Sequence, residues 1–225
     1  MPELPDPSDL DLSVQWPLSP AWPRFASPLR LGVMASGEGS NFEALVASCR
    51  QGPLGAEVAL LVVNHSACGA QRRAERLQVP WQLLDHRKHA NREALDGALV
   101  QAFRRAEVDL VVMAGWMRIV TPTLITAFPD RLVNIHPSLL PSFRGLDGIG
   151  QALAAGVTLT GCTAHLVTEE VDAGPILVQA AVPVLAGDDH GLLAARVRHQ
   201  EHRILPLAVA LAAQRLGLAQ PEPQG

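Results

Sequence analysis

Short apolar runs alternate along this chain with longer amphipathic segments, and this alternation restricts the fold more than any other feature. Three of the runs, at 29–34, 58–63 and 108–113, are apolar almost throughout. Such runs are typical of parallel strands that are buried on both faces. Because helical patterns fill the intervals between them, the sequence predicts an α/β fold, a single Rossmann-like doubly wound domain with a parallel sheet in its N-terminal half.

The remaining elements follow from the same periodicities. We expect helices at 41–50, 69–77, 91–105, 121–128 and 148–155, and shorter strands at 81–84 and 131–136. Two further strand patterns, 158–168 and 176–185, follow each other directly with only a turn between them, so they should add antiparallel strands in the C-terminal half. A long helix over 188–218 should then close the domain, with a kink at Pro206.

The chain of 225 residues favours one domain. Residues 1–28 contain seven prolines, which block both helix and sheet, so we expect a poorly ordered or loosely docked N-terminal extension. It lacks the features of a signal or transit peptide. Residues 29–218 should form the domain, and residues 219–225 a flexible tail.

Composition excludes several classes of partner. The formal net charge of −4 gives no basic footprint for nucleic acid or an anionic membrane. No apolar stretch reaches the length of about 20 residues that spans a bilayer. The three cysteines are scattered and odd in number, which fits a reducing, cytoplasmic compartment. A small-molecule partner is therefore expected.

No metal site is expected either. Cys162 and His165 are three residues apart, which on a strand places them on opposite faces. His199 and His202 should lie on the polar side of the last helix, with no third ligand nearby.

The most informative motif spans residues 134–144, at the end of an expected strand. Asn134 and His136 share one face, roughly 7 Å apart along the strand, and Pro137 then ends the pairing. Ligands of open α/β sheets bind at the carboxyl ends of the strands. An amide and an imidazole there could donate to a carbonyl oxygen and handle a proton. A structural histidine is the plainer alternative.

A glycine-rich turn connects the first expected strand to the first helix. Free amides at such a helix start attract an anion, and Ser40 or Asn41 could cap the helix. There is no Walker motif, and Phe42 stands where the dinucleotide fingerprint has its third glycine. A single phosphate therefore fits better than a pyrophosphate, although an ordinary glycine turn is also possible.

Two carboxylates stand out from their surroundings. Asp172 lies in a tight bend between two apolar strands, and a carboxylate held against His136 would orient the ring and favour its charged form. Glu201 interrupts the apolar stripe of the last helix. Because buried carboxylates need partners, Glu201 should either pair with an internal cation or face a polar cleft that binds hydroxyl groups.

The segment 114–120 follows the third long apolar run. It could line a pocket for a flat ring, with its backbone reading the ring's edge, or it could simply continue the core.

Together these motifs resemble the phosphoribosylglycinamide formyltransferases, a family of folate-dependent transferases. The matching runs, in the family's order over about residues 29–215, are 37–41, 114–118, 134–141, 171–174 and 200–202. The resemblance implies a catalytic trio of Asn134, His136 and Asp172. It implies that Gly39, Ser40 and Asn41 bind the phosphate of glycinamide ribonucleotide, and Glu201 its ribose. It further implies folate binding by Arg92, Met117, Arg118, Ile119, Val120 and Asn134.

The implied reaction transfers a formyl group from the co-substrate 10-formyltetrahydrofolate to the amine of glycinamide ribonucleotide. The product is formyl-glycinamide ribonucleotide, in de novo purine (IMP) biosynthesis. The resemblance implies no metal, a cytoplasmic enzyme, and a monomer or homodimer. The chain departs from the family at Asp147-Gly148, where Asn or His followed by Ala or Thr is common, so substrate contacts there are in question.

Three alternatives fit less well. A methionyl-tRNA formyltransferase needs a further C-terminal domain and a basic surface, and a formyltetrahydrofolate deformylase needs an N-terminal regulatory domain. A non-enzymatic nucleotide- or folate-binding module has no need for Asn134 and His136 together.

Overall fold

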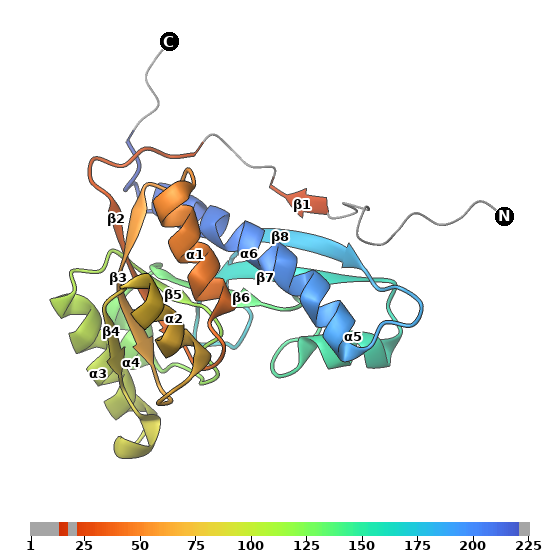
Figure 1. The fold of residues 1–225 in the computed structure, drawn as a ribbon, viewed down its shortest axis with the longest axis horizontal. Helices are drawn as coiled ribbons and strands as arrows, with labels where there is room; N and C mark the ends of the chain where they lie inside the picture. Colours follow the sequence, from red (N-terminus) through yellow and green to blue (C-terminus); the bar gives the residue numbers. More distant parts are fainter. Residues whose placement is uncertain (1–13, 18–21, 221–225) are drawn as a thin grey trace, which may run out of the picture.

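The computed structural model describes residues 14–17 and 22–220. These residues form one eight-stranded mixed sheet in the order β1-β8-β7-β6-β5-β2-β3-β4, with helices packed on both faces (Figure 1). The expected α/β class, with a parallel N-terminal half and antiparallel strands in the C-terminal half, is confirmed.

The N-terminal half is the parallel part of the sheet. Its strands are β2 (Leu29–Ala35), β3 (Ala56–Val63), β4 (Trp81–Leu83), β5 (Leu110–Met113) and β6 (Leu132–His136). Its helices are α1 (Ser40–Gln51), α2 (Gly69–Leu77), α3 (Arg92–Arg105) and α4 (Pro122–Ala127), with a short 3-10 helix η1 (His86–Lys88). Asn91 and Thr121 cap α3 and α4 with their side-chain oxygens, as Asn and Thr commonly do.

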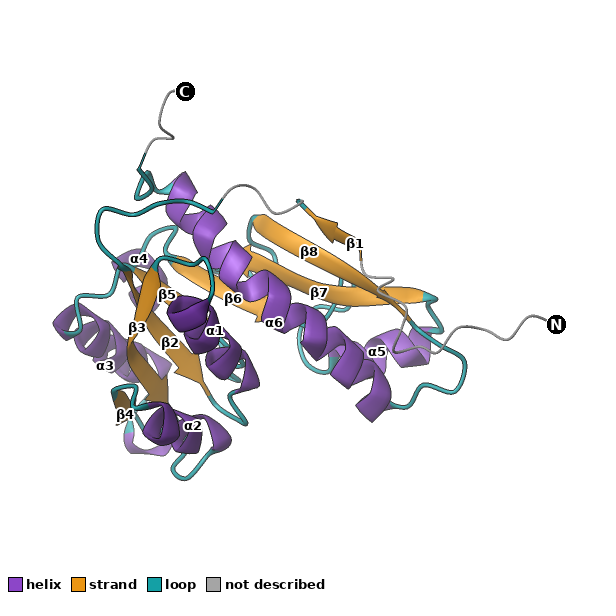
Figure 2. Cartoon of the chain, turned by 45° about the horizontal axis from the view of Figure 1, so that its top comes forward, coloured by secondary structure: helices purple, strands orange, loops and turns teal. Residues whose placement is uncertain are grey.

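The C-terminal half contains α5 (Gly148–Ala155), β7 (Leu159–Leu166), β8 (Ile176–Pro183) and α6 (His190–Arg215). β7 pairs antiparallel with both β6 and β8. The helix α6 continues through Pro206, which is buried in its second half. Figure 2 shows this long helix lying across one face of the sheet.

The prediction that prolines exclude sheet from the N-terminal extension is wrong for three residues. β1 (Val14–Trp16) pairs antiparallel with β8, with Val14 opposite Ala181. These residues contain no proline, and an edge strand needs only one side of its backbone to be paired. Trp22 packs against the core, whereas the side chain of Trp16 is exposed. Residues 1–13, 18–21 and 221–225, on which the rest of the extension and most of the tail fall, lie outside the described residues.

Two hydrophobic cores lie on opposite faces of the sheet. Buried residues of α1, α2 and α6 form one, and those of α3 and α4 the other, as a doubly wound fold requires. Phe103 of α3 contacts Phe128 edge-on with ring centroids 6.2 Å apart, which helps to anchor the second layer. None of the described helices is long and apolar enough to cross a membrane.

Candidate functional site

A cleft of about 500 Å³ opens at the carboxyl ends of β5 and β6. This is the edge at which α/β proteins bind ligands. Residues from the segment after β5, from β6, from the turn between β7 and β8, and from α6 line it. The residues of the sequence prediction that line it are Asn41, Met117, Arg118, Ile119, Val120, Asn134, His136, Asp172 and Glu201.

His136 is the last residue of β6 and is almost fully buried. Its Nδ1 lies 3.3 Å from Oδ2 of Asp172, so the predicted contact between the ring and this carboxylate is confirmed. Its Nε2 lies 2.9 Å from the backbone oxygen of Phe143. Because each ring nitrogen faces an oxygen, only the protonated ring can donate to both at once.

Asp172 adopts a left-handed backbone conformation with φ of 52°, which turns its carboxylate back towards the cleft. The backbone N–H of Gly145 donates to Oδ2 at 2.9 Å. Burial raises the pKa of Asp172, but the hydrogen bonds of His165 and Gly145 and the charge of His136 outweigh it, so the pKa lies below its usual range. Asp172 is therefore an anion that contacts the ring of His136.

His165 is a member of this cluster that the sequence did not reveal. It stands opposite Asn134 in the β6–β7 register, and its Nε2 lies 3.1 Å from Nδ2 of Asn134 and 3.6 Å from Oδ1 of Asp172. Its Nδ1 lies 2.9 Å from the backbone oxygen of Leu166, so Nδ1 is the ring nitrogen that donates there. The Nε2 side of the ring thus contacts both Asn134 and Asp172.

The glycine turn differs from the prediction in how the helix begins. The N-cap of α1 is Gly39, with φ of 75°, and neither Ser40 nor Asn41 caps it with its side chain. A Cβ at Gly39 would lie 2.6 Å from Cα of Ala70, so the turn needs glycine for space as well as for conformation. Asn41 lines the cleft, whereas Gly39 and Ser40 lie beside it at the start of α1.

Glu201 is buried on α6 and faces the cleft, which is the second of the two predicted alternatives. The Nδ2 of Asn41 donates to its Oε2 at 2.9 Å. Burial raises the pKa of Glu201, and the hydrogen bond from Asn41 and the positive charges of Arg198 and His136 offset this only in part. Arg198, one turn earlier on α6, is a further cation near this end of the cleft that the sequence analysis missed.

The segment after β5 both lines the cleft and continues the core. Trp116 and Val120 are buried in the core, whereas Met117 and Ile119 are mostly exposed along the cleft. Arg92 is not brought to the cleft: it is the exposed first residue of α3 and is absent from the lining residues.

The segment that departs from the family pattern forms the other wall of the cleft. Asp147 caps α5 by accepting from the N–H of Gly150 at 3.0 Å, and its Oδ1 lies 2.9 Å from Nε2 of His190. The hydrogen bond with His190 and that from Gly150 lower the pKa of Asp147. Asp147 thus joins the start of α5 to the start of α6 instead of pointing freely into the cleft.

Among the described residues, no three His, Cys, Asp or Glu side chains are grouped as metal ligands.

His202 does not lie fully on the polar side of α6 as predicted, because its Nε2 is buried. Burial of Cys162 raises the pKa of its thiol well above the usual value.

The fold and the cleft define a class: an α/β transferase whose amide, imidazole and carboxylate meet at the carboxyl edge of the sheet. The family model described as formyl transferase matches residues 29–209. The chain therefore belongs to the formyl transferase family.

Relatives of known name agree with this. Phosphoribosylglycinamide formyltransferase of Bacillus subtilis is 38% identical over 189 residues, covering 84% of this chain and 95% of that protein. The human trifunctional purine biosynthetic protein adenosine-3 is 41% identical over 184 residues, and there the chain spans 18% of the relative's length.

A solved structure is also similar. The glycinamide ribonucleotide transformylase 1 of Symbiobacterium toebii is 44% identical, with a TM-score of 0.82 over 84% of this chain and 89% of that one.

Proposed function

We propose that this chain transfers the formyl group of 10-formyltetrahydrofolate to the amine of glycinamide ribonucleotide, a step of de novo purine biosynthesis. The observation that carries the proposal is the convergence of Asn134, His136 and Asp172 in the cleft. The names of the full-length relatives support the choice of this acceptor.

In the proposed mechanism, Asn134, His136 and Asp172 act around the formyl carbon. The substrate amine attacks the formyl carbon, and a tetrahedral species with a negative oxygen results. An amide N–H of Asn134 and the protonated ring of His136 stabilise that oxygen; one such donor typically contributes about 3 kcal/mol. Nδ1 of the ring faces Asp172 and Nε2 faces the backbone oxygen of Phe143, so a ring N–H donates to the substrate oxygen in exchange for one of these two contacts.

Asp172 balances the charge of the His136 ring and fixes its orientation. When the tetrahedral species collapses, the bond from carbon to the folate nitrogen breaks, and the proton lost by the amine ends on that nitrogen. All groups in this scheme act without a covalent intermediate on the enzyme.

The two substrates are assigned to the two ends of the cleft. Gly39, Ser40 and Asn41 at the start of α1 would bind the phosphate, and Glu201 the ribose hydroxyls. The backbone of residues 117–120 and the side chain of Asn134 would bind the folate. Arg92, outside the cleft, is assigned to the folate's exposed carboxylate end, where a surface cation suffices.

The remaining assignments concern the boundaries of the catalytic unit, its compartment, its oligomeric state and its co-substrate. We propose that residues 29–218 are the catalytic unit, that it acts in the cytoplasm as a monomer or homodimer, and that 10-formyltetrahydrofolate is its only co-substrate, with no metal. The match of the family model to residues 29–209 supports these boundaries.

The direct test is formyl transfer from 10-formyltetrahydrofolate, followed spectroscopically with and without glycinamide ribonucleotide. We expect tetrahydrofolate to form only when the ribonucleotide is present, in equal amount to formyl-glycinamide ribonucleotide. Release of formate without the ribonucleotide would instead identify a hydrolase, and no turnover in either case would reject the proposal.

A further inference from the structure

The segment 117–121, most of which lines the cleft, is fastened at each end by a buried side chain from another element. The N–H of Met117 donates to Oγ of Ser36 at 2.9 Å. The N–H of Thr121 donates to Oδ2 of Asp96 at 2.5 Å. Neither Ser36 nor Asp96 belongs to the trio or to the binding residues assigned above.

Ser36 is the first residue after β2 and is 8% exposed. Its own N–H donates to the backbone oxygen of Gly115 at 3.0 Å, so the ladder between β2 and β5 continues past both strands. Gly115 then turns with φ of 84°. The hydroxyl of Ser36 accepts from the amide of Met117, two residues after Gly115, and this directs the segment along the cleft.

Asp96 lies on α3, on the other face of the sheet, and is 2% exposed. A buried carboxylate is costly unless it accepts hydrogen bonds. Burial raises the pKa of Asp96, and the bond from Thr121 counteracts this only in part. Asp96 is buried at a cost in desolvation and accepts from the last amide of the segment. The backbone at Thr121 is thus fixed by a hydrogen bond and not by packing alone.

Between these two points, Met117 and Ile119 remain 66% and 54% exposed over the cleft. Apolar side chains in this state make few contacts of their own, so the backbone bonds at the ends determine where they lie.

We propose that Ser36 and Asp96 are positioning residues for folate binding, which hold the backbone of residues 117–120 at the spacing that the folate ring requires. This inference rests on the proposed function, because the ligand of this wall is taken to be the folate.

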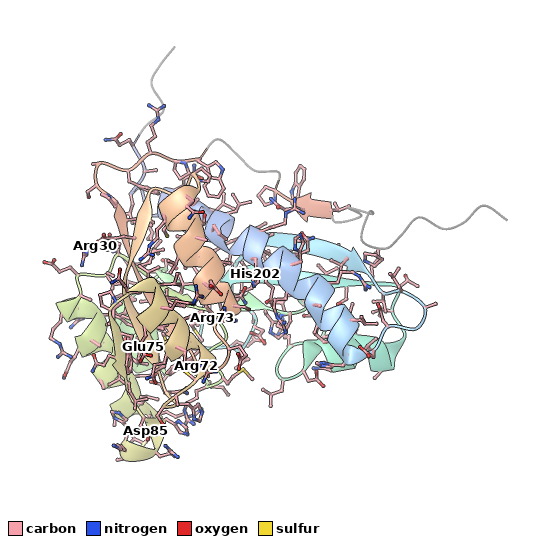
Figure 3. All side chains as sticks on the ribbon, in the orientation of Figure 1. Arg30, Arg72, Arg73, Glu75, Asp85 and His202 are labelled. Atoms are coloured by element: carbon pink, nitrogen blue, oxygen red, sulfur yellow. The ribbon has the colours of Figure 1, made fainter. Side chains whose placement is uncertain are left out.

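The chain offers a matched control at the opposite, amino ends of the same two strands, β2 and β5. There the N–H of Arg30, in β2, donates to Oδ2 of Asp109, just before β5, at 2.8 Å. Figure 3 labels Arg30, near the amino end of β2, and Asp85, beyond the carboxyl end of β4, so the two labels mark the two ends of the parallel strands. Loss of the Asp109 carboxylate thus removes a bond of the same kind between the same strands, away from the cleft.

The experiment compares Ser36→Ala, Asp96→Ala, Asp96→Asn and Asp109→Ala with the natural chain. Calorimetric titration with tetrahydrofolate gives the Kd of the folate, and steady-state assays give KM for each substrate. Amide hydrogen exchange over residues 115–121 reports the two backbone bonds directly.

We expect Ser36→Ala and Asp96→Ala to raise the Kd for tetrahydrofolate about tenfold, the size expected for one buried hydrogen bond. KM for the ribonucleotide should stay the same, and the Met117 or Thr121 amide should exchange faster. Asp96→Asn keeps an acceptor oxygen and should bind as the natural chain does. Asp109→Ala should lower Tm without changing the Kd.

The outcomes separate the two proposals. If the natural chain does not bind tetrahydrofolate, the proposed function fails. If it binds, but Ser36→Ala and Asp109→Ala have the same Kd, the positioning role is wrong and Ser36 is only structural. Should Asp96→Ala fail to fold, Ser36→Ala and the amide exchange decide the question alone.

Discussion

Asn41 and Glu201, 160 residues apart in the chain, share a buried hydrogen bond of 2.9 Å across the cleft. It joins the start of α1 to the middle of α6, the two helices to which the ribonucleotide is assigned. One oxygen of Glu201 is thus occupied by the protein and the other can accept from a ligand. The side chain combines a structural contact with a costly buried charge.

Glu201→Gln should therefore stabilise the protein and weaken its binding of the ribonucleotide. The amide oxygen of Gln can still accept from Asn41, and the buried charge is gone. An acid whose pKa is raised on folding loses stability as the pH rises through that pKa, so the gain should appear at neutral pH and vanish in acid. Each kcal/mol should raise Tm by about 2–4 °C. Melting curves at several pH values and KM for the ribonucleotide check this; an unchanged KM would contradict the ribose role.

Asp172→Asn should lower kcat by about 100-fold or more, because the variant cannot balance the charge of His136. His136→Ala should do at least as much. The pKa of Asp172 is lowered on folding, so its ionic contacts stabilise the fold at neutral pH and are lost as the pH falls through that pKa. Asp172→Asn should thus cost stability at neutral pH but not in strong acid. Turnover near the natural rate with a native circular dichroism spectrum would reject the trio.

His165→Ala should lower kcat by about tenfold, less than loss of His136. Its Nε2 contacts Asn134 and faces Asp172, so it fixes those side chains and does not hold the reacting oxygen. The effects of substituting two residues that act through the same hydrogen bond are not additive. The double variant with Asn134→Ala should therefore lose less than the two single losses combined, and a fully additive loss would show that the two act independently.

Gly39→Ala should destabilise the protein and weaken ribonucleotide binding, because the Cβ would lie 2.6 Å from Cα of Ala70 and the backbone φ is positive. Gly37, two residues earlier, is the matched control for stability. A Cβ there meets no atom within 4 Å, so Gly37→Ala should leave Tm unchanged. Equal melting temperatures for the two variants would show that the turn can relax.

The regular elements could be predicted because each depends on local chemistry. The apolar runs of β2, β3 and β5 predict those strands to within a few residues, and the helical periodicities predict α3 and α4 as closely. The first turn was predicted less well: Gly39 supplies the N-cap, and the side chain of Asn41 is held by Glu201 from the other end of the chain.

The cluster around His136 could be predicted only in part. Asn134 and His136 share a strand, so their spacing follows from the period of two. His165 enters through the β6–β7 register, which depends on packing between distant segments and leaves no local signal. The position of the Asp172 carboxylate depends on a left-handed turn at a residue that is not glycine. The roles of these residues stay predictions.

A chain without residues 1–21 should keep its activity but lose the cover on one edge of the sheet. β1 lies on β8, two strands away from β6, so its loss should leave kcat and both KM values unchanged if residues 29–218 are the catalytic unit. Exposed strand edges promote association between chains. Sedimentation velocity should therefore show more self-association in the shortened chain than in the natural one. Gln15→Pro in the full-length chain, which removes a backbone donor from β1, should have the same effect, because the edge and not the chain length is responsible. A shortened chain that loses turnover would place the extension within the catalytic unit.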